Sequence, residues 1–397
     1  MKKNSFKITA ALLLSLMLAV VACDKNDDDD DAAVVTGNIV ITENISVDTK
    51  WEAGKVYELG GRITVLSGAT LTIEAGTIIK GQAGTGANAT ALLVARGAKL
   101  MAEGTDKAPI IFTSLADEIS PADVAAGKFA SPNLDPDIDG LWGGVLILGK
   151  APISVSGDAK EVQIEGIPTS DQNGLYGGTD AADNSGVIKY ISIRHGGANI
   201  GSGNEINGLT LGAVGSGTVV ENIEVIANQD DGIEWFGGTV NVKNVVILNV
   251  NDDAIDTDQA WSGTLENFVV ITPGDHCFEL DGPEGSMKGG HTIKNGTVVS
   301  VSSDESRVSV DLLNVDANSI VTLKDIHYVN PTTGQKINRV TAAEVVFDNI
   351  TMNVAADKLA EHVNGTVPAS VKTGNTAKTD VSKLTWTWAH QAGLLSF

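Results

Sequence analysis

A short motif that recurs along the second half of the chain constrains its fold more than any other feature of the sequence. From about residue 186, each copy has two alternating residues, a charged residue, an Asn-like position and then an apolar strand. The spacings between successive Asn-like positions, from Tyr190 to Asn349, are 32, 22, 23, 28, 30 and 24 residues. A period in the low twenties that is loosened by insertions is typical of a β-solenoid, in which each coil buries its apolar face only against its neighbours.

The first part of the chain carries a related pattern of short strands between glycine-rich turns. Ranges 62–65, 70–73 and 77–79 alternate or run apolar, and glycine pairs or single glycines separate them. Gly contributes 44 of 397 residues, whereas aromatic residues make up only 5%. This composition and these strand lengths predict an all-β chain rather than an α/β chain. We expect one solenoid domain over residues 36–397, with loop insertions at about 116–140 and 167–186.

The Asn-like column has a structural interpretation. In a stack of parallel coils, amides in the same turn of successive coils form a hydrogen-bonded ladder that satisfies otherwise unpaired backbone groups. We therefore assign the column a structural role rather than a ligand-binding role. Its members are Asn222, Asn244, Asn267, Asn295, Asp325 and Asn349.

The N-terminal residues predict export and lipidation. Residues 1–22 combine a positively charged start with an apolar stretch that is too short to span a bilayer. The stretch ends at Ala22-Cys23, which resembles a bacterial lipobox, and we expect Cys23 to be the lipidated first mature residue. Residues 23–35 form an acidic tether, because the consecutive charges from Asp27 to Asp31 cannot pack.

Several segments resemble a largely uncharacterised family of bacterial cell-envelope lipoproteins that are right-handed parallel β-helices. They are Gly140–Val145, Tyr176–Gly178, Tyr190–Gly197, Asn204–Leu209, Asp230–Gly238 and Trp386–Ala389. The resemblance implies a single-stranded, right-handed parallel β-helix, and it implies no established activity. The acidic tether also resembles the export signal of Bacteroidetes-type surface lipoproteins, which implies a lipid anchor in the outer membrane and display at the cell exterior.

Acidic residues recur at the coil period. Asp231, Asp253 and Asp275 are each 22 residues apart. Ile233, Ile255 and Cys277 follow two residues later and should point inward, so Glu234 and Asp256 should point outward. Stacked coils lie about 4.8 Å apart, where two carboxylates repel by roughly 3–4 kcal/mol at an effective dielectric constant of 20. Backbone N–H donors, raised pKa values or a bound cation such as calcium must offset this repulsion.

A second acidic motif is Asp135-Pro136-Asp137-Ile138-Asp139. It matches the first half of a calcium-binding EF-hand loop, which makes Asp135, Asp137 and Asp139 candidate metal ligands. The match stops at Leu146, which occupies the position of the bidentate Glu. An acidic loop is therefore a better interpretation than a complete EF-hand.

Three tryptophans are candidate platforms for stacking on sugar rings: Trp142, Trp235 and Trp261. Packing within turns or loops is the alternative for each of them. A net charge of −23 argues against a nucleic-acid partner, because phosphate binding needs clustered Lys and Arg.

Catalysis is compatible with the spacing of the acidic coils but is not indicated by any motif. Asp230, Asp252, Glu234 and Asp256 could supply the carboxyl pair of a glycosidase. A pectate-lyase mechanism needs a basic residue beside calcium, and Lys243 is the only Lys or Arg between residues 220 and 287. We therefore expect a surface lipoprotein that binds an extracellular ligand, a glycan, without cleaving it. The alternatives are a glycoside hydrolase or polysaccharide lyase, and a scaffold or accessory subunit of an outer-membrane nutrient transporter or adhesin.

Overall fold

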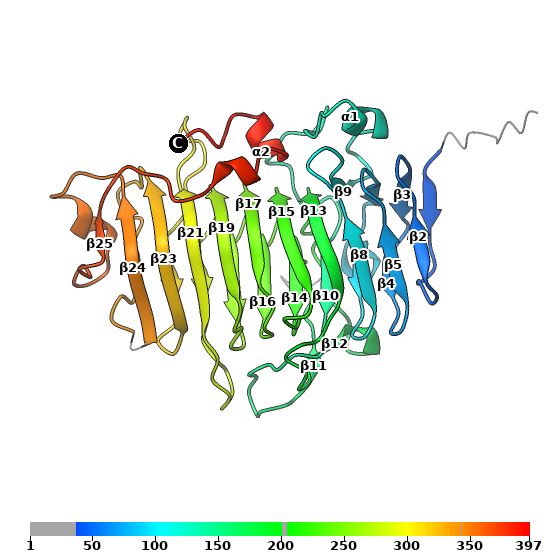
Figure 1. Ribbon diagram of the computed structural model, residues 1–397, viewed down its shortest axis with the longest axis horizontal. Coiled ribbons are helices and arrows are strands. Elements are labelled where there is room, and N and C mark those ends of the chain that lie inside the picture. The colour runs from blue at the N-terminus through cyan, green and yellow to red at the C-terminus, as the bar shows by residue number, and fades with distance from the viewer. Residues whose placement is uncertain (1–36, 201–204, 343) are drawn as a thin grey trace, which may run out of the picture. The chain divides into compact units, whose positions relative to one another are not determined.

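Two long parallel sheets run side by side through the protein (Figure 1). The computed structural model describes residues 37–200, 205–342 and 344–397, of which Asn38–Phe397 form one compact unit. The larger sheet has 15 strands: β1 (Ile39–Ile41), β2 (Thr49–Trp51), β3 (Val56–Leu59), β5 (Thr70–Ile73), β6 (Ile78–Gly81), β8 (Lys99–Glu103), β9 (Ile110–Ser114), β13 (Gly186–Arg194), β15 (Val219–Ile226), β17 (Val242–Leu248), β19 (Thr264–Ile271), β21 (His291–Val299), β23 (Ile320–Val329), β24 (Glu344–Met352) and β25 (Val371–Thr373).

The second sheet has eight strands, and each of them lies in a different coil. They are β4 (Arg62–Val65), β7 (Ala91–Val94), β10 (Val145–Leu148), β14 (Leu209–Gly212), β16 (Ile233–Phe236), β18 (Ile255–Asp258), β20 (Glu279–Leu280) and β22 (Asn314–Val315). The described strands of both sheets pair in parallel, and each pairs with the coil before and the coil after it. The all-β parallel β-helix predicted from the repeat is therefore confirmed.

The Asn-like column forms a corner within the long strands. Its seven members, from Tyr190 to Asn349, have φ between 51° and 62°, the left-handed region that Asn and Asp tolerate best. Strand pairing skips this position: Lys189 is opposite Glu221, and the next pair is Ile191 with Ile223. In earlier coils β8 and β9 are separate strands that pair with the two halves of β13. In the later coils, a single residue with a left-handed backbone conformation thus replaces the turn that separates β8 from β9.

Charged side chains lie directly before this corner and alternate in sign from Lys189 to Lys294, whereas Lys324 in the next coil has the same sign as Lys294. Glu221 pairs with Lys189 at 3.7 Å and with Lys243 at 3.0 Å. Farther along the stack, Lys294 pairs with Glu266 at 3.4 Å. These partly exposed pairs each contribute little, but they let acidic and basic residues stack in register without net repulsion.

The core is a set of inward columns, one residue per coil. Ile63, Leu92, Val145, Leu209, Ile233 and Ile255 are in register and almost fully buried. Each apolar side chain is stacked on the equivalent side chain of the next coil, which is how a chain with few aromatic residues buries a continuous core.

Three excursions cover the outside of the sheets. Residues 115–144, with α1 (Pro121–Ala125), and the C-terminal residues 379–397, with α2 (Trp388–Gln391), cover the second halves of the long strands (Figure 1). Residues 149–185, with the hairpin β11 (Val162–Gln163) and β12 (Leu175–Tyr176), pack on the eight-stranded sheet. This excursion begins directly after β10, well before the boundary at 167 that the sequence predicted.

The residues that the sequence predicts to carry a lipid anchor lie outside the described residues. Cys23 and the tether with Asp27 to Asp31 belong to this part of the chain. Among the residues that are described, no helix is long and apolar enough to cross a membrane.

Candidate functional site

An acidic recess lies on the outer face of the eight-stranded sheet. Three neighbouring strands present a carboxylate at the same register position: Glu234 of β16 is paired with Asp256 of β18, which is paired with Glu279 of β20. In the preceding coils this outward column carries Leu93, Leu146 and Thr210. The column therefore changes from Leu93 and Leu146, which pack against the excursion 149–185, to carboxylates from β16 onward.

The register of the third acidic coil differs from the sequence-based alignment by one residue. β16 and β18 are offset by 22 residues, but Asp256 pairs with Glu279, an offset of 23. Asp275 consequently lies beside Asp252, whose carbonyl accepts the Asp275 N–H at 3.2 Å. Asp275 is not the third member of the Asp231–Asp253 column; His276 takes that place. The prediction that Cys277 aligns with Ile255 is also wrong, although its thiol is buried.

Nine carboxylates line the recess, which has a volume of about 220 Å³. Its lining residues include no Lys, Arg or His and are Glu165, Glu205, Asp230, Asp231, Glu234, Asp252, Asp253, Asp256 and Glu279. Glu165 comes from the excursion 149–185, and Glu205 from the loop before β14. The other seven come from three consecutive coils.

Backbone N–H groups donate hydrogen bonds to some of these carboxylates. Asp231 Oδ1 accepts the N–H of Asp253 at 2.9 Å, and Asp253 Oδ1 accepts the N–H of His276 at 2.6 Å. The Asn207 side chain begins the same series by accepting the Asp231 N–H at 3.3 Å. Each Asp thus binds a donor of the next coil rather than a donor of its own turn. One oxygen of each carboxylate is occupied in this way.

These hydrogen bonds compensate the carboxylates of the recess only in part. Burial, with added repulsion from Glu165 and Asp252, raises the pKa of Asp230 to about 7. Burial also raises the pKa values of Asp231, Glu234 and Asp256 well above the ordinary range, and neighbouring carboxylates add to each shift. Asp256 Oδ1 is buried and has no hydrogen-bond partner in the described part of the chain. The recess therefore favours any species that brings positive charge.

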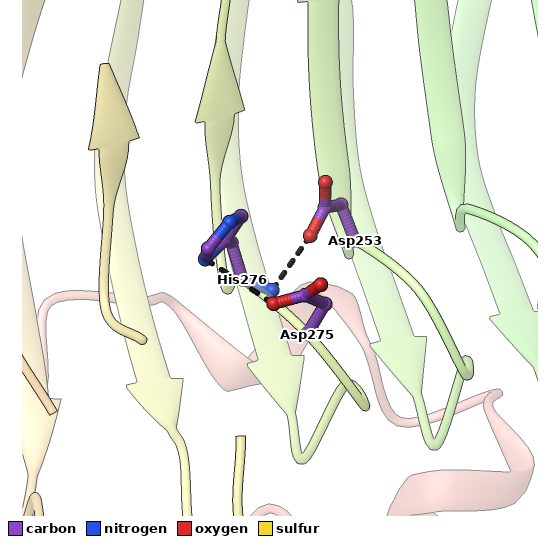
Figure 2. A group of neighbouring side chains, drawn as sticks. All are labelled: Asp253, Asp275 and His276. Carbon is purple, nitrogen blue, oxygen red and sulfur yellow. Dashed lines mark hydrogen bonds and ion pairs between the residues drawn. The ribbon is translucent and has the colours of Figure 1, made fainter. Parts of the chain in front are cut away.

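The carboxylates are close enough to bind metal ions. Ligand atoms lie within 4.8 Å of one another in four groups of three: Asp230, Asp231 and Asp252; Asp231, Glu234 and Asp256; Asp253, Asp256 and Glu279; and Asp253, Asp275 and His276 (Figure 2). Three of these groups contain only oxygen ligands, the type that Ca²⁺ and Mg²⁺ prefer. Asp256, which carries the buried and unpartnered Oδ1, belongs to two of these groups.

The three tryptophans cannot stack on a ligand, and that prediction is wrong. Trp142, Trp235 and Trp261 are at most 1% exposed. The Trp142 indole donates to the carbonyl of Arg194 at 2.7 Å, and Trp261 donates to the carbonyl of Val240 at 3.0 Å. Trp235 stacks on Trp261 with 4.7 Å between ring centroids. All three side chains belong to the hydrophobic core, so their rings fill the interior of the solenoid.

The second acidic motif does not form a cluster. Asp135, Asp137 and Asp139 lie in the excursion 115–144 and belong to none of the close ligand groups found among the described residues. Asp139 instead accepts the side-chain amide of Asn251 at 2.5 Å, and burial raises its pKa. This hydrogen bond thus connects the excursion 115–144 to the turn before β18.

Four residues of the site were not predicted as ligands: Glu165, Glu205, Glu279 and His276. Glu279 and His276 could have been found by allowing one extra residue in the third coil. Glu165 and Glu205 carry no local signal, since long-range packing of loops brings them to the recess.

Comparison with known proteins identifies one family. The family model described as a pectate-lyase-like β-helix domain matches residues 41–128 and 129–391. Neither the curated proteins nor the solved structures gave a match.

Proposed function

The chain belongs to the family of pectate-lyase-like β-helix domains, and from that premise we propose that it binds an anionic glycan through divalent cations held in the acidic recess, without cleaving the glycan. The observation that carries the proposal is the lining of the recess, in which nine carboxylates meet and no basic side chain takes part.

Cations are needed in this proposal because the bare recess would repel an acidic sugar. Two carboxylates about 4.8 Å apart already repel by roughly 3–4 kcal/mol at an effective dielectric constant of 20. Calcium takes six to eight oxygen ligands, and three carboxylates leave coordination positions for oxygens of a ligand. A uronate carboxylate can fill such positions, so the same ion would offset the repulsion and hold the glycan.

Binding is favoured over lyase chemistry by the residues at the recess. No Lys, Arg or His lines the recess, and carboxylates that already bind a divalent cation are weak acceptors for the proton of a uronate. A second candidate is glycoside hydrolysis, which is favoured by one observation: Asp230, whose pKa is raised to about 7, lies beside Asp252. A carboxyl that holds its proton up to neutral pH, next to a second carboxyl, is the kind of pair that a glycosidase uses.

The test is a binding titration of purified protein with polygalacturonate and with a neutral glycan of similar length, each in calcium and in chelator. We expect binding of the anionic glycan only, and only with calcium. Glu234→Gln with Asp256→Asn should weaken it at least tenfold, whereas Asp348→Asn, on the exposed part of β24, should not. New reducing ends would instead support hydrolysis, and unsaturated products would support a lyase. Binding that is unchanged by chelator would contradict the proposal.

The location remains part of the proposal. The signal-like residues 1–22, Cys23 and the acidic tether support a lipid-anchored protein of the outer membrane that faces the cell exterior, where it could assist a glycan transporter or an adhesin. Cys23→Ala should move the protein from the membrane fraction to the soluble fraction. Replacing Asp27 to Asp31 with Ser should leave lipidation intact but protect the protein from external protease. An unmodified mature N-terminus would remove the anchor from this proposal.

A further inference from the structure

We propose that Asp253, Asp275 and His276 form a binding site for a transition-metal ion of the Zn²⁺ type. The site differs from the oxygen-only positions of the recess by its imidazole ligand, and it shares Asp253 with one of them. The inference does not depend on glycan binding. It rests on the geometry of one imidazole and two carboxylates at the start of neighbouring strands (Figure 2).

The three ligands come from two adjacent coils. Asp253 lies in the turn before β18, and Asp275 and His276 lie in the turn before β20. His276 Nδ1 is 3.5 Å from Asp275 Oδ1, and one ligand atom of Asp253 lies within 4.8 Å of both groups. Tetrahedral zinc with bonds of about 2.0–2.2 Å places its ligand atoms about 3.3–3.6 Å apart. The His–Asp pair already has that separation, and Asp253 offers a third ligand atom within 4.8 Å of both.

Among the described residues, the ion-pair partner of the imidazole is Asp275, at 3.5 Å. His276 Nδ1 is buried and makes no hydrogen bond with any described residue, and only 18% of the side chain is exposed. A buried ring nitrogen without a hydrogen bond costs free energy, unless a proton or a metal ion joins it to the neighbouring carboxylate.

His276 also does not accept a backbone N–H of the next coil, as the other residues of its column do. At Asn207, Asp231 and Asp253, a side-chain oxygen accepts the N–H of the next coil. At His276 this acceptor is missing, and the N–H of Asp311, which forms a β-bridge with His276, donates to the carbonyl of Asp275 at 3.4 Å. The residue that interrupts the column is thus the one residue in it that brings a nitrogen ligand.

The ligand set selects the class of metal. Imidazole with carboxylate suits Zn²⁺, Co²⁺, Ni²⁺ and Mn²⁺, whereas Ca²⁺ takes oxygen ligands almost exclusively. The Asp275 side chain is 44% exposed, so the site opens to solvent. A fourth coordination position would therefore be accessible to water or to an oxygen of a bound ligand.

The experiment compares two metals on two variants of the full chain. Metal-free protein is titrated with Zn²⁺ and with Ca²⁺ by calorimetry. His276→Asn should weaken zinc binding at least tenfold and leave calcium binding unchanged. Glu234→Gln, which alters only an oxygen-only position, should weaken calcium binding and leave zinc binding unchanged. His390→Asn, which removes an exposed imidazole from α2, controls for unspecific binding.

A spectroscopic measurement on wild-type protein keeps the test valid if a variant misfolds. Zn²⁺ should shift the ring-nitrogen resonances of one histidine by NMR, and bound Co²⁺ should give a visible absorption band. Zinc binding that is equal in wild type and folded His276→Asn would overturn the inference, as would the absence of any histidine shift. Neither result bears on calcium-dependent glycan binding, which is tested separately.

Discussion

The side-chain amide of Asn244 donates to Oδ1 of Asn222 in the preceding coil at 3.0 Å, and both residues bend their strands with φ of 59°. Asn267 continues the series by donating to Asn244 Oδ1 at 2.8 Å. Asn295 does not extend it but donates to Glu266 at 3.3 Å. The Asn267 oxygen instead accepts the N–H of Asp380 at 2.7 Å, so the ladder is interrupted where the C-terminal segment crosses it. It resumes in the last coils, where the side-chain amide of Asn349 donates to Asp325.

Two substitutions at Asn244 separate the hydrogen bond from the backbone conformation. Asn244→Gly keeps the left-handed conformation accessible but removes the amide, so we expect a loss of about 1–2 kcal/mol in the free energy of unfolding. Asn244→Leu adds backbone strain, which should bring the loss to about 2–4 kcal/mol. Chemical denaturation measures both. Equal stability of the two variants would show that strain plays no part.

Removing the charge of Glu224 should be strongly destabilising. Its buried carboxylate lies 3.7 Å from Arg194 and accepts hydrogen bonds from Ser192 at 2.6 Å and from the Ala389 N–H at 3.1 Å. Glu224→Gln preserves shape but leaves the buried guanidinium unpaired, which costs about 3–5 kcal/mol. Glu224→Leu combined with Arg194→Met should cost less than Glu224→Gln alone. If the double variant is the less stable one in denaturant titration, the pair itself is stabilising.

Calcium should raise the melting temperature of the folded protein. A ligand at 100 times its dissociation constant adds about 2.7 kcal/mol when it binds only the folded state. Chelator should remove this gain, and Asp231→Asn with Asp253→Asn should abolish the response. If the backbone N–H groups alone are sufficient for these carboxylates, chelator will have no effect and the double variant will still be less stable than wild type.

In chelator, the stability of the folded protein should decrease as pH rises, because buried carboxyl groups next to the recess have raised pKa values. Burial raises the pKa of Asp258 to about 7 and that of Asp281 to about 6. A carboxyl with a raised folded pKa holds its proton more tightly in the folded state, so its contribution is complete below the unfolded value of about 4 and is lost as pH rises through the folded value. Melting curves from pH 4 to pH 8 should show this slope. Asp258→Asn should flatten it, and an unchanged slope would exclude Asp258 as a source.

The solenoid could be predicted from the sequence because the residue patterns that specify it are local and recur in each coil. The bend at Asn222, Asn244 and Asn267 needs the same residue type once per coil, and that column is visible in the chain itself. The acidic coils were visible for the same reason. The register at His276 was not, because one added residue between two strands leaves the pattern of residue types almost unchanged.

Burial of the tryptophans and the full composition of the recess required the structure. Whether Trp235 faces inward depends on the register of its strand, and an aromatic residue beside an acidic one fits either face. Glu165 reaches the recess only because the excursion 149–185 folds onto the sheet through Ile164 and Ile167. Contacts between a long loop and a distant strand leave no periodic trace in a sequence.

The return of the C-terminal segment changes how such a solenoid can fold. A stack of coils with contacts only between neighbours can nucleate anywhere and lose its end coils one at a time. Here Gln391 accepts the N–H of Phe129 at 2.9 Å, and Ala389 binds Glu224, so the last residues of the chain join coils that were synthesised long before them (Figure 1). The middle coils therefore cannot reach their final state during translation. Their unfolding should be coupled into one cooperative step that a chain ending before residue 379 would lack.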